Sequence, residues 1–218
     1  MTITITLIII IVTCAVSIPA FSNQKIIDDL IFDPPAIANN RQYYRFFTCG
    51  FIHANYMHLG FNMYSLWIFG QIVETQFLGA FGEKGKWLYL LMYVSSLFFC
   101  LLPTYSKNKE NYGYRSLGAS GAVSAVVFSF IFLDPVRKMG ILFLPQSMML
   151  PGFIFGLLYI GISSYLDKRG GGNINHSAHI WGALYGISFL IIAGSTPLAE
   201  YNLPGEFINR VQSYFHRF

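Results

Sequence analysis

Apolar runs long enough to cross a lipid bilayer recur along this chain, and short segments between them carry most of its charged residues. The hydrocarbon core of a bilayer is about 30 Å thick, so a helix that crosses it needs about 20 predominantly apolar residues. The first run, residues 2–21, contains no charged side chain. This pattern predicts a chain that crosses a membrane several times.

The composition agrees with that prediction. Charged residues make up 11% of the 218 residues and hydrophobic residues 54%, whereas a soluble domain carries about 25% charged residues. These values exclude a disordered chain, a coiled coil, collagen and a small disulfide-stapled module. The net charge of +4 is spread over many loops, which argues against a nucleic acid as a partner. The three cysteines show no CxxC spacing, so neither a disulfide framework nor a thiolate metal site is expected.

We predict an all-α fold in which residues 1–218 form a single membrane domain with six transmembrane helices. The predicted spans are residues 2–21, 46–74, 87–105, 117–133, 139–165 and 174–193. In residues 199–218, apolar side chains recur at helical spacing, which we interpret as an amphipathic helix at the membrane interface. Lysine and arginine are divided too evenly between the two sides of this arrangement to set its orientation.

Local signals define the ends of these spans. The first run lacks a basic leading segment and a convincing cleavage site, so we interpret it as a retained span rather than a signal peptide. Asp134 and Pro135 end the fourth span, because proline disfavours helix in the residue before it. Pro145 and Pro151 are expected to kink the start of the fifth span.

Ionisable side chains within the spans are candidate functional residues, because burying each in hydrocarbon costs a few kcal/mol. One carboxylate, Glu74, lies in a span, at its end. No lysine or aspartate does, which excludes a Ser–Lys dyad and an aspartyl dyad, and the chain has no HExxH motif for a zinc protease. Four histidines lie in the spans or at their mouths: His53, His58, His176 and His179.

The sequence Gly118-Ala119-Ser120-Gly121 opens the fourth span directly after a polar loop. Free backbone N–H groups surround a serine at a helix N-terminus and can stabilise an oxyanion. Flanking glycines would let a substrate carbonyl approach the backbone. The alternative is a contact between membrane helices, where glycine and serine are common.

In the sixth span, His179, Gly182 and Gly186 share one helix face. Such a face packs closely on a neighbouring helix. If that neighbour is the fourth span, whose Gly121 and Ala125 also form a face of small residues, His179 lies next to Ser120. The alternative is a histidine that only forms a hydrogen bond between helices.

His58 and Asn62 lie four residues apart on one face of the second span. Together they could donate hydrogen bonds to an oxyanion, or they could form a structural polar clasp. Glu74 lies about 160° around the same helix from His58, so we expect it to stabilise loop backbone or span ends. A metal or haem site built from the four histidines is a further alternative, but it leaves Ser120 and Asn62 without a role.

Three signatures therefore occur in order: His-x3-Asn, Gly-x-Ser-Gly and Ala-His-x2-Gly-x3-Gly. Together they resemble the rhomboid family of intramembrane serine proteases. The resemblance covers nearly the whole chain, including the six spans and the long loop after the first. Tyr44-Arg45 before the second span is similar to the family's Trp-Arg element, with tyrosine in place of tryptophan.

The resemblance implies roles for individual residues. Ser120 matches the nucleophile and His179 the general base of a dyad without an acidic third member. Asn62 and His58 match the oxyanion side chains, assisted by the backbone N–H groups of Ser120 and Gly121. Supporting positions matched in the same way are Gly118, Gly182, His53, Glu74 and Arg45.

Two positions depart from the family pattern. One turn after the nucleophile the family often has an aromatic residue that stacks on the catalytic histidine, and here that residue is Ser124. The orientation of His179 is therefore less well explained. His176, one turn before His179, is an additional histidine with no assigned role.

The resemblance implies a serine endopeptidase that needs no cofactor and cleaves transmembrane helices of single-span membrane proteins within the lipid bilayer. The alternative is a non-catalytic rhomboid-like protein that binds membrane helices of its clients. Because the chain is minimal, with neither a seventh span nor a transit peptide, we expect a prokaryotic cell membrane as its location.

Overall fold

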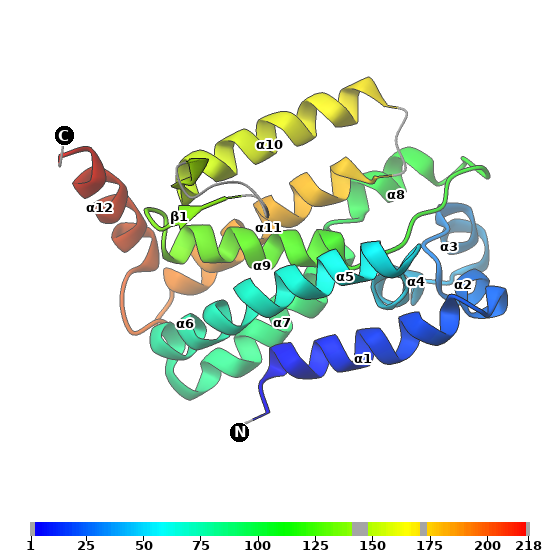
Figure 1. The fold of residues 1–218 in the computed structure, drawn as a ribbon, viewed down its shortest axis with the longest axis horizontal. Coiled ribbons are helices and arrows are strands. Elements are labelled where there is room, and N and C mark those ends of the chain that lie inside the picture. The colour runs from blue at the N-terminus through cyan, green and yellow to red at the C-terminus, as the bar shows by residue number, and fades with distance from the viewer. Residues whose placement is uncertain (1–2, 141–147, 171–173, 217–218) are drawn as a thin grey trace.

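A computed structural model describes residues 3–140, 148–170 and 174–216, which are mostly helical (Figure 1). The helices of the first half are α1 (Ile5–Ala20), α2 (Gln24–Leu30), α3 (Pro34–Asn40), α4 (Arg45–Thr48), the 3-10 turn η1 (Cys49–Phe51), α5 (Tyr56–Ser65), the π-helical stretch η2 (Leu66–Gly70), α6 (Gln71–Phe81), the 3-10 turn η3 (Gly82–Lys84), α7 (Gly85–Phe99) and α8 (Leu102–Asn108). The second half contains α9 (Ser120–Leu133), β1 (Lys138–Met139), β2 (Leu150–Pro151), α10 (Gly152–Arg169), α11 (His176–Gly194) and α12 (Leu203–Phe215).

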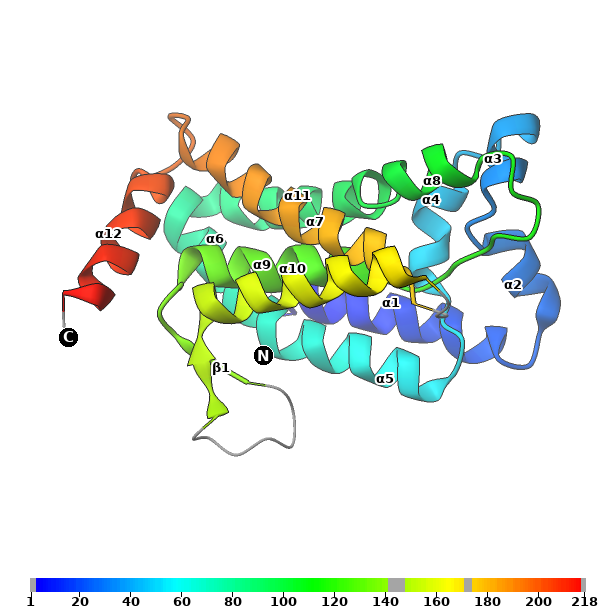
Figure 2. The same cartoon turned by 90° about the horizontal axis from the view of Figure 1, so that it is seen from above.

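Helix α9 forms the centre of the molecule. All of its residues except Ser120 and Val127 are buried, and α5, α6, α7, α10 and α11 pack around it (Figures 1 and 2). It ends at Leu133, directly before Asp134-Pro135, as the sequence predicts. A helix that is apolar on every face needs neighbours on every side, which explains its central position.

The two ends of the bundle hold different elements. In Figure 2, α2, α3 and α8 lie at one end, while α12 and the turn between α6 and α7 lie at the other. That turn reverses the chain at Gly82, whose φ of +58° favours glycine. By length and apolarity, two helical stretches of the described residues could cross a membrane, Tyr56–Asn108 and His176–Gly194, whereas α1 and α9 are apolar but shorter.

The second predicted span begins and ends later than expected. Residues 46–55 form α4, η1 and an extended segment, and the long helix starts only at Tyr56, where the Asn55 side chain accepts a hydrogen bond from the His58 N–H. This cap satisfies one of the free N–H groups at the start of the helix. The helix then continues through η2 and α6 to Phe81 rather than stopping near Glu74.

The fifth predicted span was placed too early. Around Met139 the chain forms β1, which pairs antiparallel with β2, and α10 starts at Gly152. The first free N–H groups of α10 donate to the carbonyls of Arg137 and Pro135, at 2.9 Å each, so the turn before β1 caps the helix. Pro151 directly precedes the helix, and Pro145 lies outside the described residues.

Helix α10 lies at the periphery of the bundle (Figure 1). Only Gly152, Gly156 and Ser163 of its residues are buried. Large apolar side chains such as Leu157 and Ile162 are exposed, as expected for a surface in contact with lipid. Helix α12 packs on the end of α9 through stacked rings of Phe132 and Phe207, 5.0 Å apart.

Candidate functional site

Ser120 is the first residue of α9 and follows a tightly held turn. Gly118 in that turn has φ of +112°, a conformation that side chains rarely adopt. A Cβ added there would also lie 2.7 Å from Cε1 of His58. Glycine at this position therefore lets the turn and the imidazole ring of His58 pack against each other.

Backbone hydrogen bonds hold the segment before Ser120 in place. Ser116 exchanges two N–H···O bonds with Phe32, of 3.0 and 3.1 Å. The Gly118 N–H donates to the carbonyl of Cys49 at 2.9 Å. The nucleophile candidate thus stands at the end of a loop that is fixed to two elements far away in the sequence.

The structure brings Ser120 and His179 together, with 2.7 Å between Oγ of the serine and Nε2 of the histidine. Within the described residues, no carboxylate is hydrogen-bonded to His179. The ring of His176 lies 6.0 Å from that of His179, centroid to centroid, and edge-on to it. The arrangement is therefore a pair of residues in which the imidazole can remove the hydroxyl proton.

Close packing of α11 on α9 sets this distance. A Cβ at Gly182 would collide with the backbone of Gly121, and a Cβ at Gly186 with the backbone of Ala125. The absence of side chains at two consecutive turns lets the two helix backbones touch. His179, one turn before Gly182, is thereby held against the first residue of α9.

His58 on α5 lies against Gly118 in the turn before Ser120, and Asn62 is one turn further along the same helix. Asn62 is buried, and its Nδ2 donates to the carbonyl of His58 at 2.9 Å, which leaves one of its two N–H bonds for another acceptor. Nδ1 of His58 accepts a bond from the Ala54 N–H at 3.4 Å, so in the neutral ring Nε2 carries the hydrogen. Nε2 is the ring nitrogen that packs against Gly118.

Two predicted supporting residues bind backbone in other parts of the fold. The carboxylate of Glu74 accepts hydrogen bonds from the N–H groups of Ile5 and Thr6, at 2.8 and 2.9 Å, at the start of α1. Arg45 donates to the carbonyls of Asp28 and Ile31, at 2.8 Å each, next to the end of α2. Both residues connect segments that are distant in the sequence.

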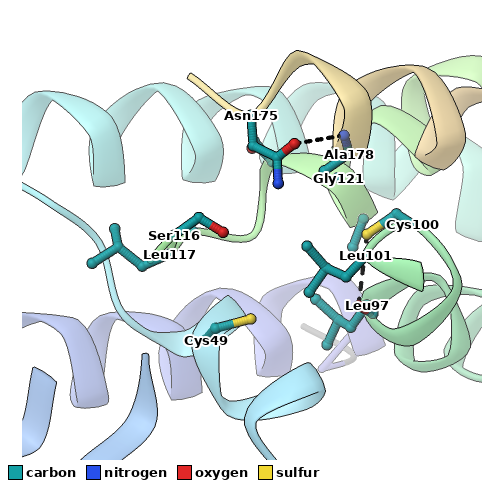
Figure 3. Close-up of a pocket in the computed structure, with 12 residues that line it drawn as sticks. Cys49, Leu97, Cys100, Leu101, Ser116, Leu117, Gly121, Asn175 and Ala178 are labelled. Carbon is teal, nitrogen blue, oxygen red and sulfur yellow. Dashed lines mark hydrogen bonds between the residues drawn. The ribbon is translucent and has the colours of Figure 1, made fainter. Parts of the chain in front are cut away.

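A small cavity of about 20 Å³ borders Ser120 (Figure 3). Its lining includes Cys49, Cys100 and Asn175. Asn175 caps α11 by accepting a bond from the Ala178 N–H at 3.0 Å, and its Nδ2 is buried without a partner among the described residues. Asn175 is not among the predicted site residues, although an asparagine just before an apolar helical run is a typical N-cap.

Two contacts at the site were also not predicted. Ser124, at the position where the family often has an aromatic residue, forms a 3.2 Å hydrogen bond with the hydroxyl of Tyr159 on α10. Ser17 on α1 lies 2.9 Å from Nδ1 of His53. No local signal marks either pair, because each joins two segments whose contact depends on the tertiary fold. Among the described residues, no group of three or more His, Cys, Asp or Glu side chains is placed to hold a metal ion.

Comparison with known families matches residues 40–196 to the Rhomboid domain. Among curated proteins, "Rhomboid-like protein 11, chloroplastic" of Arabidopsis thaliana is 29% identical over 170 residues, covering 72% of this chain and 55% of that protein. "Presenilin-associated rhomboid-like protein, mitochondrial" of Bos taurus is 31% identical over 145 residues, covering 64% and 35%. "Putative rhomboid protease YdcA" of Bacillus subtilis is 29% identical over 155 residues, covering 70% and 69%. The matched part of the chain thus spans about half or less of the first two relatives.

Proposed function

Because this chain belongs to the Rhomboid family of membrane proteins, we propose that it is an intramembrane serine endopeptidase that cleaves transmembrane helices of single-span proteins. The observation that carries the proposal is the 2.7 Å contact between Ser120 Oγ and His179 Nε2 at the start of the buried helix α9. The name of the Bacillus relative, a putative rhomboid protease, supports the same reaction class.

In the proposed first step, His179 takes the hydroxyl proton of Ser120 while Oγ attacks the scissile carbonyl. The C–O bond that forms leaves a tetrahedral intermediate with a negative oxygen. His179 then gives its proton to the departing amine, the C–N bond breaks, and an acyl-enzyme remains. Water attacks this ester in the second half of the reaction, with His179 again as the base, and restores the Ser120 hydroxyl.

The proposed oxyanion site combines side chains and backbone. Its donors are the free N–H of Asn62, the Nε2–H of His58 and the backbone N–H groups of Ser120 and Gly121, which lie in the first turn of α9 and lack partners within their own helix. The removal of one such donor from a serine protease costs about 2.7–4 kcal/mol of transition-state stabilisation. Supporting roles are proposed for Gly118, which brings the turn close to His58, and for Gly182, which brings α11 close to α9.

A fluorophosphonate probe tests the proposal, because it reacts covalently with activated serines. We expect the purified protein in detergent to be labelled, and labelling to be lost in Ser120→Ala and in His179→Ala. Ser129→Ala is the matched control, since it removes another hydroxyl of α9 whose bonds run to Ala125 and Met92. Labelling of Ser120→Ala at the wild-type rate would refute the assignment of the nucleophile.

Cleavage is tested in parallel with a single-span reporter protein that has small, helix-weakening residues near one membrane face. We expect proteolysis by the wild type and none by Ser120→Ala. A folded wild type that neither labels nor cleaves, but captures the reporter helix, would overturn the proposal in favour of a non-catalytic helix-binding protein.

A further inference from the structure

The geometry points to His53 as a positioning residue for the nucleophile, an inference that rests on the function proposed above. We infer that its neutral imidazole holds the backbone N–H of Ala119 and connects it through Ser17 to helix α1. Through these hydrogen bonds, α1 helps to fix the position of Ser120. His53 itself takes no part in the transfer of the Ser120 proton.

His53 lies fully buried between three elements. It follows η1 in the chain, its Nδ1 is 2.9 Å from the hydroxyl of Ser17 on α1, and its Nε2 accepts a 3.4 Å hydrogen bond from the N–H of Ala119. Its ring also lies edge-on to that of His58, 5.0 Å away between centroids. A buried imidazole with partners on both nitrogens has a fixed orientation.

The hydrogen-bond directions determine which nitrogen carries the hydrogen. The Ala119 N–H can only donate, so Nε2 of His53 must offer its lone pair. The hydroxyl of Ser17 donates its single hydrogen to the carbonyl of Phe51, at 2.7 Å, and must therefore accept from His53. His53 is consequently neutral with its hydrogen on Nδ1. The hydrogen bonds then form one continuous chain, in which Ala119 donates to His53, His53 to Ser17, and Ser17 to the carbonyl of Phe51.

Among the hydrogen bonds that join Gly118 and Ala119 to other segments of the described structure, the bond to His53 is the only one made by a side chain. Ser116 and Gly118 are held by the backbone of Phe32 and Cys49. Ala119 precedes the nucleophile directly, and its own side chain cannot cap α9. The contact from His53 is therefore the last constraint before Ser120.

Two substitutions of His53 each remove the hydrogen bond of one ring nitrogen and keep that of the other. In His53→Gln, the side-chain oxygen can reach the place of Nε2 and still accept the Ala119 N–H, but the bond to Ser17 is lost. In His53→Asn, the shorter amide keeps the bond to Ser17 and loses the one to Ala119. Because a displacement of about 1 Å can cost about 100-fold in rate, we expect His53→Asn to slow fluorophosphonate labelling by about 10–100-fold. We expect His53→Gln to keep most of the wild-type rate.

Two variants of helix α1 test the hydrogen bond between Ser17 and His53. Ser17→Ala removes the hydroxyl that orients His53. Thr13→Val removes a buried hydroxyl on the same face of α1 that has no hydrogen-bond partner in the described structure. We expect slower labelling in Ser17→Ala and an unchanged rate in Thr13→Val. Ser17→Ala should also unfold at a lower temperature than Thr13→Val, because it leaves the Phe51 carbonyl and the His53 Nδ1–H without a partner.

Each outcome either supports or overturns the inference. If His53 only holds α1 in place, His53→Asn will react with the probe faster than His53→Gln, and the labelling rates of these two variants will follow their unfolding temperatures. This result overturns the inference. The hydrogen on Nδ1 is tested without any activity, by ¹⁵N NMR of histidine-labelled protein, with His53→Gln used to assign the resonance. A hydrogen on Nε2 of His53 overturns the inference. A wild type that has the hydrogen on Nδ1 but does not react with the fluorophosphonate probe refutes only the proposed protease function.

Discussion

The side chain of Asn62 forms a hydrogen bond within its own helix. Its Nδ2 donates to a carbonyl four residues earlier in its own helix, so one N–H is used locally and the other is available to another acceptor. Such a local bond contributes little to stability when the carbonyl is also available to the helix backbone. The proposed catalytic role of Asn62 and its contribution to stability can therefore be measured separately.

We predict that Asn62→Ala lowers kcat about 100–1,000-fold with little change in KM, because an oxyanion donor acts mainly in the transition state. Kinetics on the reporter substrate check this. Asn108→Ala is the matched control: Asn108 is equally buried, at 7% exposure against 6%, and donates in the same way to the carbonyl of Thr104 at 2.9 Å. An equal loss of kcat in both variants would contradict a role specific to Asn62.

At the scale of secondary-structure elements, the contact between α9 and α11 determines whether Ser120 and His179 meet. The contact depends on the absence of a side chain at Gly182, where a Cβ would strike backbone rather than a movable side chain. Backbone cannot move aside cheaply, so the two helices would have to separate.

We predict that Gly182→Ala destabilises the protein by about 1–3 kcal/mol, the usual cost of overpacking, and abolishes labelling of Ser120. Thermal unfolding and the fluorophosphonate rate measure the two effects. Gly161→Ala on α10 is the control, because a Cβ there meets no atom within 4 Å. Alanine is a better helix former than glycine, so this control should be neutral or stabilising by up to about 1 kcal/mol.

The start of α1 depends on a carboxylate from α6. Glu74 accepts three hydrogen bonds there, from the N–H groups of Ile5 and Thr6 and from the Thr6 hydroxyl. A negative charge at a helix N-terminus is also favourable because of the helix dipole. The acid therefore caps a helix that precedes it by about 70 residues.

We predict that Glu74→Gln lowers the free energy of unfolding by about 1.5–3 kcal/mol, the value of hydrogen bonds to a charged group. The amide has one oxygen in place of two and would point an N–H at a backbone N–H. Thermal unfolding in detergent provides the measurement, with the exposed Glu83→Gln as control. Equal unfolding temperatures for the two variants would show that the cap contributes nothing.

For the whole molecule, the central question is how many times the chain crosses the membrane. The six predicted spans place the loops at one end of the bundle, with α2, α3 and α8, on one side of the membrane. The α6–α7 turn and α12 then lie on the other side (Figure 2). The two ends are separated by apolar helices whose exposed side chains suit lipid.

We predict that single cysteines introduced at Ser22 and Asn111 react with an impermeant maleimide from one side of sealed vesicles, and those at Lys84 and Glu200 from the other. Buried Cys49 and Cys100 should stay unreactive in the intact fold, and Cys14 is replaced by alanine. Labelling of Asn111→Cys and Lys84→Cys from the same side would rule out the six-span arrangement.

Much of this protein could be predicted from local sequence patterns. Apolar runs indicated helices, and proline after Asp134 indicated where α9 ends, because both effects act within a few residues. Polar side chains inside apolar runs identified Ser120, His179, His58 and Asn62 as candidates for the same reason. The start of α10 was predicted wrongly, since its cap consists of carbonyls in a turn before β1 that no periodicity reveals.

The sequence by itself determined that this chain is a helical membrane protein of the Rhomboid family and which polar residues stand out in its apolar helices. Only the tertiary structure decided which of them meet. The 2.7 Å approach of Ser120 to His179 requires α9 and α11 to touch at Gly121 and Gly182. The hydrogen bond between Ser17 and His53 requires α1 to pack beside the segment that follows η1. Such contacts join residues far apart in the chain, and their geometry depends on helix packing, which hydropathy and spacing do not encode.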